Sequence, residues 1–205
     1  LVFRMTDTLT ARQLLDRLVA FPTVSSSTNL PLIYFVRDYF LSHGIDSEVI
    51  PNEDGTKAGL IAAVGPDVTG GVALSAHSDV VPVEGQNWTT EPWKVIEKDG
   101  RIYGRGTCDM KGFVALAIAA MVKAKASNLK RPLQFALSRD EEVGLLGAPD
   151  VAQGLLDKFA KVDAVLVGEP TEMKVVTGHK SCDDLQFHVR GHEVHSSLLH
   201  EGVSA

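Results

Sequence analysis

The first part of the chain carries two stretches in which apolar side chains recur at helical spacing. One follows Thr10, which forms a capping-box pattern with Gln13 and precedes the apolar positions Leu14, Leu15, Leu18 and Val19. The other is closed by Gly44, a residue type favoured just beyond a helix. Its apolar positions are Leu32, Ile33, Val36, Tyr39 and Phe40. The pattern therefore predicts two amphipathic helices before the first strand.

Beyond residue 44 the pattern changes to short apolar runs separated by turn residues. We predict strands over residues 45–50, 60–64, 72–75, 133–137 and 164–167, and helices over residues 110–126 and 145–156. Strands that alternate with amphipathic helices are typical of an α/β layer, in which helices flank a mostly parallel sheet. The sequence therefore predicts the α/β fold class for this part of the chain.

The pattern changes again near residue 175. Leu185, Phe187 and Val189 alternate with polar residues, which is typical of a half-exposed antiparallel strand. We therefore predict two domains. Residues 1–174 form the α/β domain, and residues 175–205 begin a second, α+β domain.

Composition and charge limit the class of partner. Lys and Arg total 20 against 26 Asp and Glu, the formal net charge is -6, and no basic stripe is visible, so a nucleic-acid partner is not expected. The sequence also lacks the apolar run of roughly 18 residues that would cross a bilayer, so a membrane partner is not expected either. Two well-separated cysteines, Cys108 and Cys182, make no disulfide framework and fit a reducing compartment. We predict a soluble, cytoplasmic protein.

Ionisable residues lie at the ends of several predicted elements. After the ends of predicted strands come His77 and Asp79, then Glu141 and Glu142, then Glu169, while Asp109 precedes the helix at residues 110–126. Ligands of α/β sheets bind at the carboxyl ends of the strands, so we expect these side chains to share one edge. Each segment alone also has a structural interpretation, as a solvated loop, a helix cap or an exposed acidic turn.

Taken together, these residue types indicate a metal site. Carboxylates combined with one imidazole suit zinc, cobalt or manganese, and there are enough of them for two ions if one carboxylate bridges a pair about 3.5–4 Å apart. Asp79 is placed to accept the second ring N–H of His77. Of the adjacent Glu141 and Glu142, one can bind metal while the other acts as a general base.

Four motifs resemble the two-zinc amidohydrolases, the family that includes acetylornithine deacetylase, succinyl-diaminopimelate desuccinylase and aminoacylase. They lie at residues 77–82, 106–112, 140–144 and 168–171. Their order and spacing agree with the family over nearly the whole chain. Residues 20–25, 178–180 and 191–197 most resemble the acetylornithine deacetylase branch.

The resemblance implies a zinc-exopeptidase-like catalytic domain, followed by a lid that serves for dimerisation. It implies two bound Zn²⁺ or Co²⁺ ions. His77 and Glu169 would hold one ion, Asp109 would bridge, and Glu142 would hold the second. Glu141 would be the general base, and Asp79 would orient His77. His195 would reach across a homodimer to the substrate.

The resemblance also implies the reaction, hydrolysis of the N-acetyl amide of N2-acetylornithine in arginine biosynthesis. Two alternatives stay open: another acyl-amino acid or dipeptide as the substrate, or a non-catalytic fragment. The family's second metal has a late histidine ligand that no residue of this chain can supply. We therefore expect the 205-residue chain by itself to be weakly active or inactive.

Overall fold

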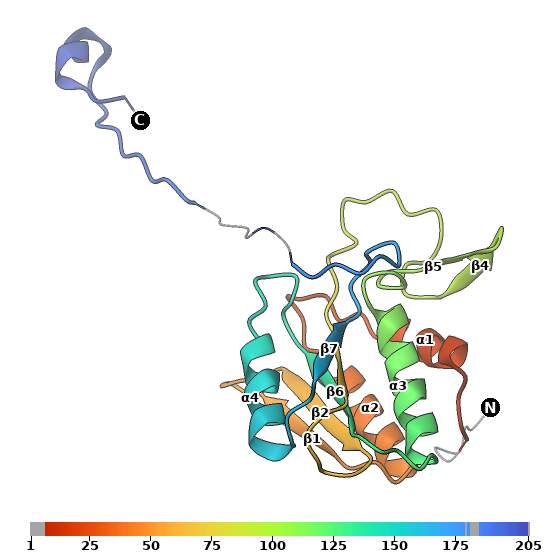
Figure 1. Cartoon of the computed structure of the whole chain (residues 1–205). Coiled ribbons are helices and arrows are strands. Elements are labelled where there is room, and N and C mark those ends of the chain that lie inside the picture. Colours follow the sequence, from red (N-terminus) through yellow and green to blue (C-terminus); the bar gives the residue numbers. More distant parts are fainter. Residues whose placement is uncertain (1–6, 179, 181–184, 205) are drawn as a thin grey trace. The chain divides into compact units, whose positions relative to one another are not determined.

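The computed structural model describes residues 7–178, 180 and 185–204 (Figure 1). It contains two compact units, Leu1–Pro170 and Thr171–Ala205, which are described separately below. His179 and Cys182, from segments considered above, lie outside the described residues. The domain boundary at residues 174 and 175 stays a prediction.

The first unit begins with the two helices that the apolar spacing predicts, α1 (Ala11–Val19) and α2 (Leu30–Ser42). The capping box of α1 is formed, because the Gln13 amide donates to the Thr10 hydroxyl at 3.2 Å and the Thr10 amide donates to the Gln13 side chain at 2.9 Å. All nine predicted apolar positions of α1 and α2 are buried. Gly44, with φ of 68°, follows α2 in the left-handed region.

A five-stranded sheet forms the centre of this unit, in the order β1-β2-β6-β3-β7. Its strands are β1 (Ser47–Pro51), β2 (Ala58–Val64), β3 (Val72–His77), β6 (Leu133–Ser138) and β7 (Ala164–Val167). β3 runs parallel to both β6 and β7, whereas β2 runs antiparallel to both β1 and β6. The α/β prediction is confirmed. The sheet is mixed because a short turn joins β1 to β2, and parallel neighbours would need a long crossover.

Helices cover both faces of the sheet (Figure 1). On one face, α1, α2 and α3 (Lys111–Lys125) enclose the main core with residues such as Leu60 and Phe135. On the other face, α4 (Ala148–Lys158) packs on Ile61 and Ala136 through Val151. Leu60 and Ile61 point to opposite faces because side chains alternate along a strand.

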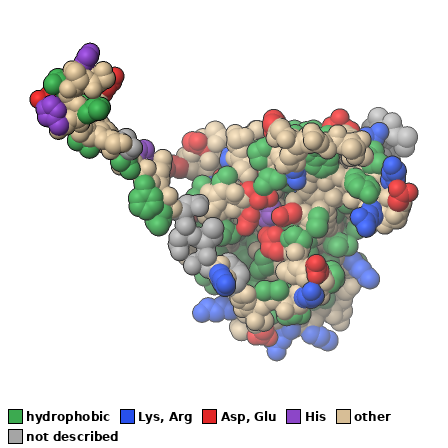
Figure 2. Space-filling view, turned by 90° about the horizontal axis from the view of Figure 1, so that it is seen from above, with side chains coloured by type: hydrophobic (Ala, Val, Ile, Leu, Met, Phe, Trp, Pro, Cys, Tyr) green, Lys and Arg blue, Asp and Glu red, His purple; other side chains and the backbone are tan. Residues whose placement is uncertain are grey.

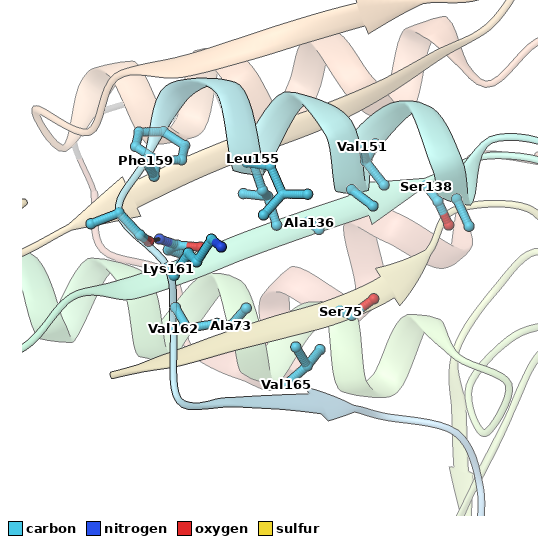
Figure 3. Close-up of a pocket in the computed structure, with 15 residues that line it drawn as sticks. Ala73, Ser75, Ala136, Ser138, Val151, Leu155, Phe159, Lys161, Val162 and Val165 are labelled. Carbon is cyan, nitrogen blue, oxygen red and sulfur yellow. Dashed lines mark hydrogen bonds between the residues drawn. The ribbon is translucent and has the colours of Figure 1, made fainter. Parts of the chain in front are cut away.

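An apolar groove lies on the α4 face of the sheet, with a volume of about 540 Å³ (Figure 3). Val151 and Leu155 of α4 line one side, and Ala73 of β3 and Val165 of β7 line the other. All four residues of β7 are exposed. None of the predicted metal ligands lines this groove, so it is separate from the chemistry considered below.

A small hairpin, β4 (Ile96–Lys98) and β5 (Arg101–Tyr103), was not among the predicted elements. Its turn residues, Asp99 and Gly100, both have positive φ, of 53° and 70°. That is the type I′ pattern that an Asp-Gly pair favours. The Asp-Gly pair was therefore a sequence signal for this hairpin.

The second unit differs from its prediction. Residues 185–190 form no strand, and Leu185, Phe187 and Val189 are 79%, 81% and 71% exposed. A strand needs a neighbour for its backbone groups, and no described segment pairs with these residues. The unit does contain a 3-10 helix, Ser196–Glu201, and a bridge between His192 and Val203.

A membrane-spanning helix is not found among the described residues, since none of their helices is both long and apolar enough.

Candidate metal centre

Three parallel strand ends place the candidate ligands at one edge of the sheet. His77 is the last residue of β3 and pairs in register with Ser138, the last residue of β6. Ser75 of β3 pairs with Val167, the last residue of β7. The acidic segments at residues 140–142 and 169 therefore begin next to His77. Acidic side chains gather around a histidine on this face in Figure 2.

The imidazole of His77 is the meeting point of the site. Its Nε2 lies 3.1 Å from Asp109 Oδ1, 3.6 Å from Glu169 Oε1 and 4.0 Å from Glu141 Oε2. Asp109 reaches it from the turn that precedes α3, where the Asp109–Met110 peptide bond is cis. The side chain of His77 is 1% exposed, whereas that of Asp109 is 48% exposed. The ring thus forms the floor of the site, and carboxylates stand between it and solvent.

Two groups of side chains could each hold a metal ion. One contains His77, Asp109 and Glu169, and the other contains His77, Glu141 and Glu142. Within each group the candidate ligand atoms lie within 4.8 Å of one another. All five residues predicted to bind metal or act as base are therefore brought together. The imidazole is common to both groups.

Asp79 contacts the site differently from the expectation that its carboxylate orients His77. The Nδ1 atom of His77 lies 2.9 Å from the backbone carbonyl oxygen of Asp79, and 3.6 Å from the carboxylate atom Oδ1. The carboxylate instead accepts hydrogen bonds from the backbone amides of Glu141, at 3.1 Å, and Glu142, at 3.3 Å. Asp79 thus contacts His77 through its main chain and the glutamates through its side chain.

The pKa of His77 reflects the charges around it. Burial lowers this pKa, but the Asp79 carboxylate beside the ring, with the charges of Glu169 and Glu141, outweighs burial and raises it to about 9. Burial also raises the pKa of Asp79, yet the neighbouring His77 ring and the hydrogen bonds from Ser25 and the Glu141 amide bring it down to about 2. The raised pKa of His77 therefore reflects the negative charge that surrounds its ring.

Burial and the crowding of carboxylates raise the pKa values of two glutamates, whereas that of Asp79 is lowered. Burial raises the pKa of Glu169, and after the opposing charge of His77 the charges of Asp109 and Glu141 add to it, giving about 7. Burial raises the pKa of Glu142 as well, and Asp109 adds to this effect. Such crowding is relieved by cations, and one imidazole with several carboxylates is a donor set that zinc, cobalt and manganese accept. The residues fit divalent metal ions.

Asp140 is separated from the other two acids of its segment. Asp140 is buried. The partly buried Lys57 donates from Nζ to its carboxylate, and Arg139 donates to its other oxygen at 3.0 Å. The three consecutive carboxylates therefore do not share one site, as Asp140 belongs to a structural ion pair. Sequence reasoning missed Lys57, which carries no local signal because it lies far along the chain from Asp140.

A buried lysine, Lys111, lies close to the site. Its side chain is inaccessible, and Nζ donates to the Phe21 carbonyl oxygen at 2.7 Å. Burial lowers its pKa to about 7, against the opposing charge of Asp79. The motif at residues 106–112 contained Lys111, but the pattern gave no indication that its side chain turns inward.

His195 lies in the second unit, on the exposed surface. Its Nδ1 is 2.8 Å from the Ser197 hydroxyl and accepts the Ser197 amide at 3.3 Å, so it caps the 3-10 helix. The role of His195 toward a substrate stays a prediction.

Residues 73–199 match the model of Peptidase family M20/M25/M40, and the chain belongs to this family. It is 36% identical over 94% of its length to the acetylornithine deacetylase of Pasteurella multocida (strain Pm70). It is 38% identical over 98% of its length to the acetylornithine deacetylase of Myxococcus xanthus. The chain spans about half the length of these curated relatives, 51% and 53%.

Solved structures show the same fold at lower identity. Human carnosine dipeptidase 1 matches with a TM-score of 0.66 and 24% identity, over 77% of this chain and 38% of its own. The M20 family metallo-carboxypeptidase Sso-CP2 of Sulfolobus solfataricus matches with a TM-score of 0.67 and 20% identity, over 77% of this chain and 37% of its own. These likenesses support the zinc-exopeptidase-like α/β fold.

Proposed function

We propose that this chain supplies the metal-binding and catalytic residues of an amidohydrolase that converts N2-acetyl-L-ornithine to L-ornithine and acetate. The observation that carries the proposal is the convergence of Asp109, Glu141, Glu142 and Glu169 on His77. The substrate is suggested by the two acetylornithine deacetylases, because the chain is 36% and 38% identical to them.

The proposed roles keep the ligand group of His77, Asp109 and Glu169 and take only Glu142 as a ligand from the other group. His77 and Glu169 would hold one ion, Glu142 would hold a second, and Asp109 would bridge them. Two divalent cations, which we propose to be Zn²⁺ or Co²⁺, supply charge that polarises the acyl carbonyl and lowers the pKa of water. The remaining chemistry belongs to Glu141, which accepts a proton from the attacking water and returns it to the leaving amine.

Several features of the whole protein are part of the same proposal. Residues 1–174 would form the catalytic domain, and residues 175–205 would begin a lid and dimerisation domain. His195 would contact the substrate across a homodimer. The enzyme would act in the cytoplasm, in arginine biosynthesis, and its partner would be a small acyl-amino acid.

Turnover of three substrates tests the assignment in the protein encoded by the complete gene. We expect N2-acetylornithine to give a higher kcat/KM than N-succinyl-diaminopimelate and N-acetylmethionine, and chelation to abolish the reaction. A higher kcat/KM with either competitor would replace acetylornithine with another acyl-amino acid. Absence of hydrolysis with all three would favour a non-catalytic role.

The 205-residue chain is expected to be weakly active or inactive when assayed alone. In the described residues, both ligand groups depend on the single imidazole of His77, so one of the two sites lacks a histidine of its own. Robust metal-dependent deacetylation by the purified chain would contradict this expectation.

A further inference from the structure

Ser25 contacts Asp79 beside the candidate metal centre, although it is not a candidate ligand. Its side chain is buried, with the residue 8% exposed, and its hydroxyl donates to Asp79 Oδ2 at 2.6 Å. The backbone around it is fixed, because the Ser25 amide donates to the Val80 carbonyl oxygen at 3.3 Å and Val24 forms a parallel bridge with Val80. The hydroxyl is therefore held against one carboxylate.

That carboxylate in turn holds the backbone of two site residues. Asp79 Oδ1 accepts the amide of Glu141, and Oδ2 accepts both the Ser25 hydroxyl and the amide of Glu142. The bond to Glu142, at 3.3 Å, is the longest of the three. A rotation of the Asp79 carboxylate would therefore affect the Glu142 amide first.

The segment that carries the two glutamates is held from its other side as well. The carbonyl oxygen of Glu141 accepts the amides of Gly144 and Leu145, each at 3.1 Å. Asp140, just before, has a positive φ of 56°. The direction in which the two side chains leave the backbone thus depends on a tight turn, one end of which is fixed by Asp79.

We propose that Ser25 is a positioning residue for Glu141 and Glu142, and that it acts through the carboxylate of Asp79. The hydroxyl fixes the rotation of this carboxylate so that each oxygen faces one glutamate amide. Glu142 is then aimed at the metal, and Glu141 at the water and the leaving amine. The catalytic part of this inference rests on the proposed reaction, whereas the effect on metal geometry rests only on the proposed metal binding.

The test compares Ser25→Ala with Thr23→Val as a matched control. Thr23 is also buried and also uses its hydroxyl, but it donates to the Ser78 carbonyl oxygen at 2.6 Å and not to Asp79. Both variants lose one buried hydrogen bond of the same segment. A purely structural role for Ser25 would therefore make the two variants behave alike.

The first readout is the visible spectrum of the Co²⁺-loaded protein during titration with Co²⁺, which needs no substrate. Ser25→Ala is expected to change the spectrum and to weaken Co²⁺ binding about 10- to 100-fold, as loss of a group that orients metal ligands commonly does. Thr23→Val should keep the spectrum of the unchanged protein. Ser25→Thr, which retains the hydroxyl, should restore it.

The second readout is turnover of N2-acetylornithine by the complete protein, in which kcat of Ser25→Ala should fall more than KM changes. Identical spectra for Ser25→Ala and the unchanged protein would overturn the inference, and so would equal changes in Ser25→Ala and Thr23→Val. If Ser25→Ala does not fold, Ser25→Cys gives the same comparison, because a thiol fills the site but donates weakly. An altered Co²⁺ spectrum without any acetylornithine turnover would support the positioning role and reject the proposed function.

Discussion

His77 is the residue on which both groups of candidate ligands depend. Its ring is buried, its Nδ1 atom is fixed by the Asp79 carbonyl oxygen, and its Nε2 atom faces the carboxylates. One nitrogen is thus used for orientation and the other is left for a metal, an arrangement that sets the tautomer of a histidine ligand. The two ring nitrogens of His77 thus have different roles, so the ring can be held in place while Nε2 remains available to a metal among the carboxylates.

Replacement of Glu141 by glutamine tests the division of labour between the two adjacent glutamates. In the complete protein, we expect Glu141→Gln to keep its metal and to lose about 10²- to 10⁴-fold in kcat, because it removes a base and not a ligand. Metal content by atomic emission and kcat should be measured on the same sample. Loss of metal from this variant would exchange the roles of Glu141 and Glu142.

Metal binding should release protons, because the ligands must be deprotonated. At pH 7 the His77 ring, with a pKa of about 9, is almost fully protonated to imidazolium, and Glu169, with a pKa of about 7, is half protonated. We therefore expect metal binding to release roughly 1.5 protons. Affinity for Zn²⁺ should rise from pH 6 to pH 8. Calorimetry in buffers of different ionisation enthalpy measures this, and an affinity independent of pH would contradict it.

The same shifts determine how the metal-free chain responds to pH. The folded pKa of His77 exceeds its ordinary 6.5, so its contribution to stability is complete below pH 6.5 and is lost as pH rises through about 9. The contribution of Glu169 is likewise lost as pH rises, between pH 4.5 and about pH 7. Asp79 acts oppositely, contributing above 3.8 and losing its contribution as pH falls toward about 2. Lys111, whose pKa is lowered to about 7, opposes the loss from His77 between pH 7 and pH 9. Urea unfolding at pH 5 and pH 7 should therefore show a lower free energy of unfolding at pH 7, where Glu169 and His77 lose their contributions and Lys111 has added little.

Among the elements, the parallel strands β3, β6 and β7 do most to build the site, since their carboxyl ends meet at one edge. Asp109 does not lie at a strand end but in the turn of residues 104–110, which precedes α3. Gly112, in the first turn of α3, allows this turn to approach, because a Cβ at residue 112 would lie 2.4 Å from the Thr107 carbonyl oxygen. The position of Asp109 thus depends on a glycine three residues away.

Gly112→Ala should therefore weaken metal binding. Alanine normally stabilises a helix by about 0.5–1 kcal/mol relative to glycine, whereas overpacking costs about 1–3 kcal/mol, so we expect net destabilisation and a displaced Asp109. Thermal unfolding and Zn²⁺ titration check this. Leu116→Ala, at a residue of the same helix that is 60% exposed, is the control and should leave Zn²⁺ affinity unchanged. Equal affinity in the two variants would contradict the role of Gly112.

Elements were predictable where a local rule decides their structure. Apolar residues at helical spacing predicted α1 and α2, and short apolar runs predicted the strands of the sheet. Both patterns depend only on residues that are neighbours in sequence. The alternation at residues 185–189 predicted a strand that the structure does not contain. A strand also requires a partner strand, and the spacing of apolar residues does not show whether one is present. Long-range contacts such as Ser25 with Asp79 and Lys57 with Asp140 were likewise invisible, because 54 and 83 residues separate the partners.

At the scale of the whole molecule, the chain combines a well-buried α/β layer with an acidic edge that fits divalent cations. It belongs to Peptidase family M20/M25/M40 and spans about half the length of its curated relatives. The residues that meet at this edge were predictable from the sequence because the carboxyl ends of parallel strands converge in α/β sheets. The sharing of His77 between two ligand groups was not, because it depends on where each carboxylate points.

In the proposed site, His77 and the carboxylates around it bind metal while Glu141 stays free as the base. Anomalous X-ray diffraction at the zinc absorption edge, on crystals of this chain grown with Zn²⁺, would locate the metal. We expect a zinc ion bound by His77, Asp109 and Glu169, at about 2.0–2.2 Å from their ligand atoms, with no ion on Glu141. Zinc bound elsewhere while His77 stays bare, or zinc coordinated by Glu141, would contradict the proposed site.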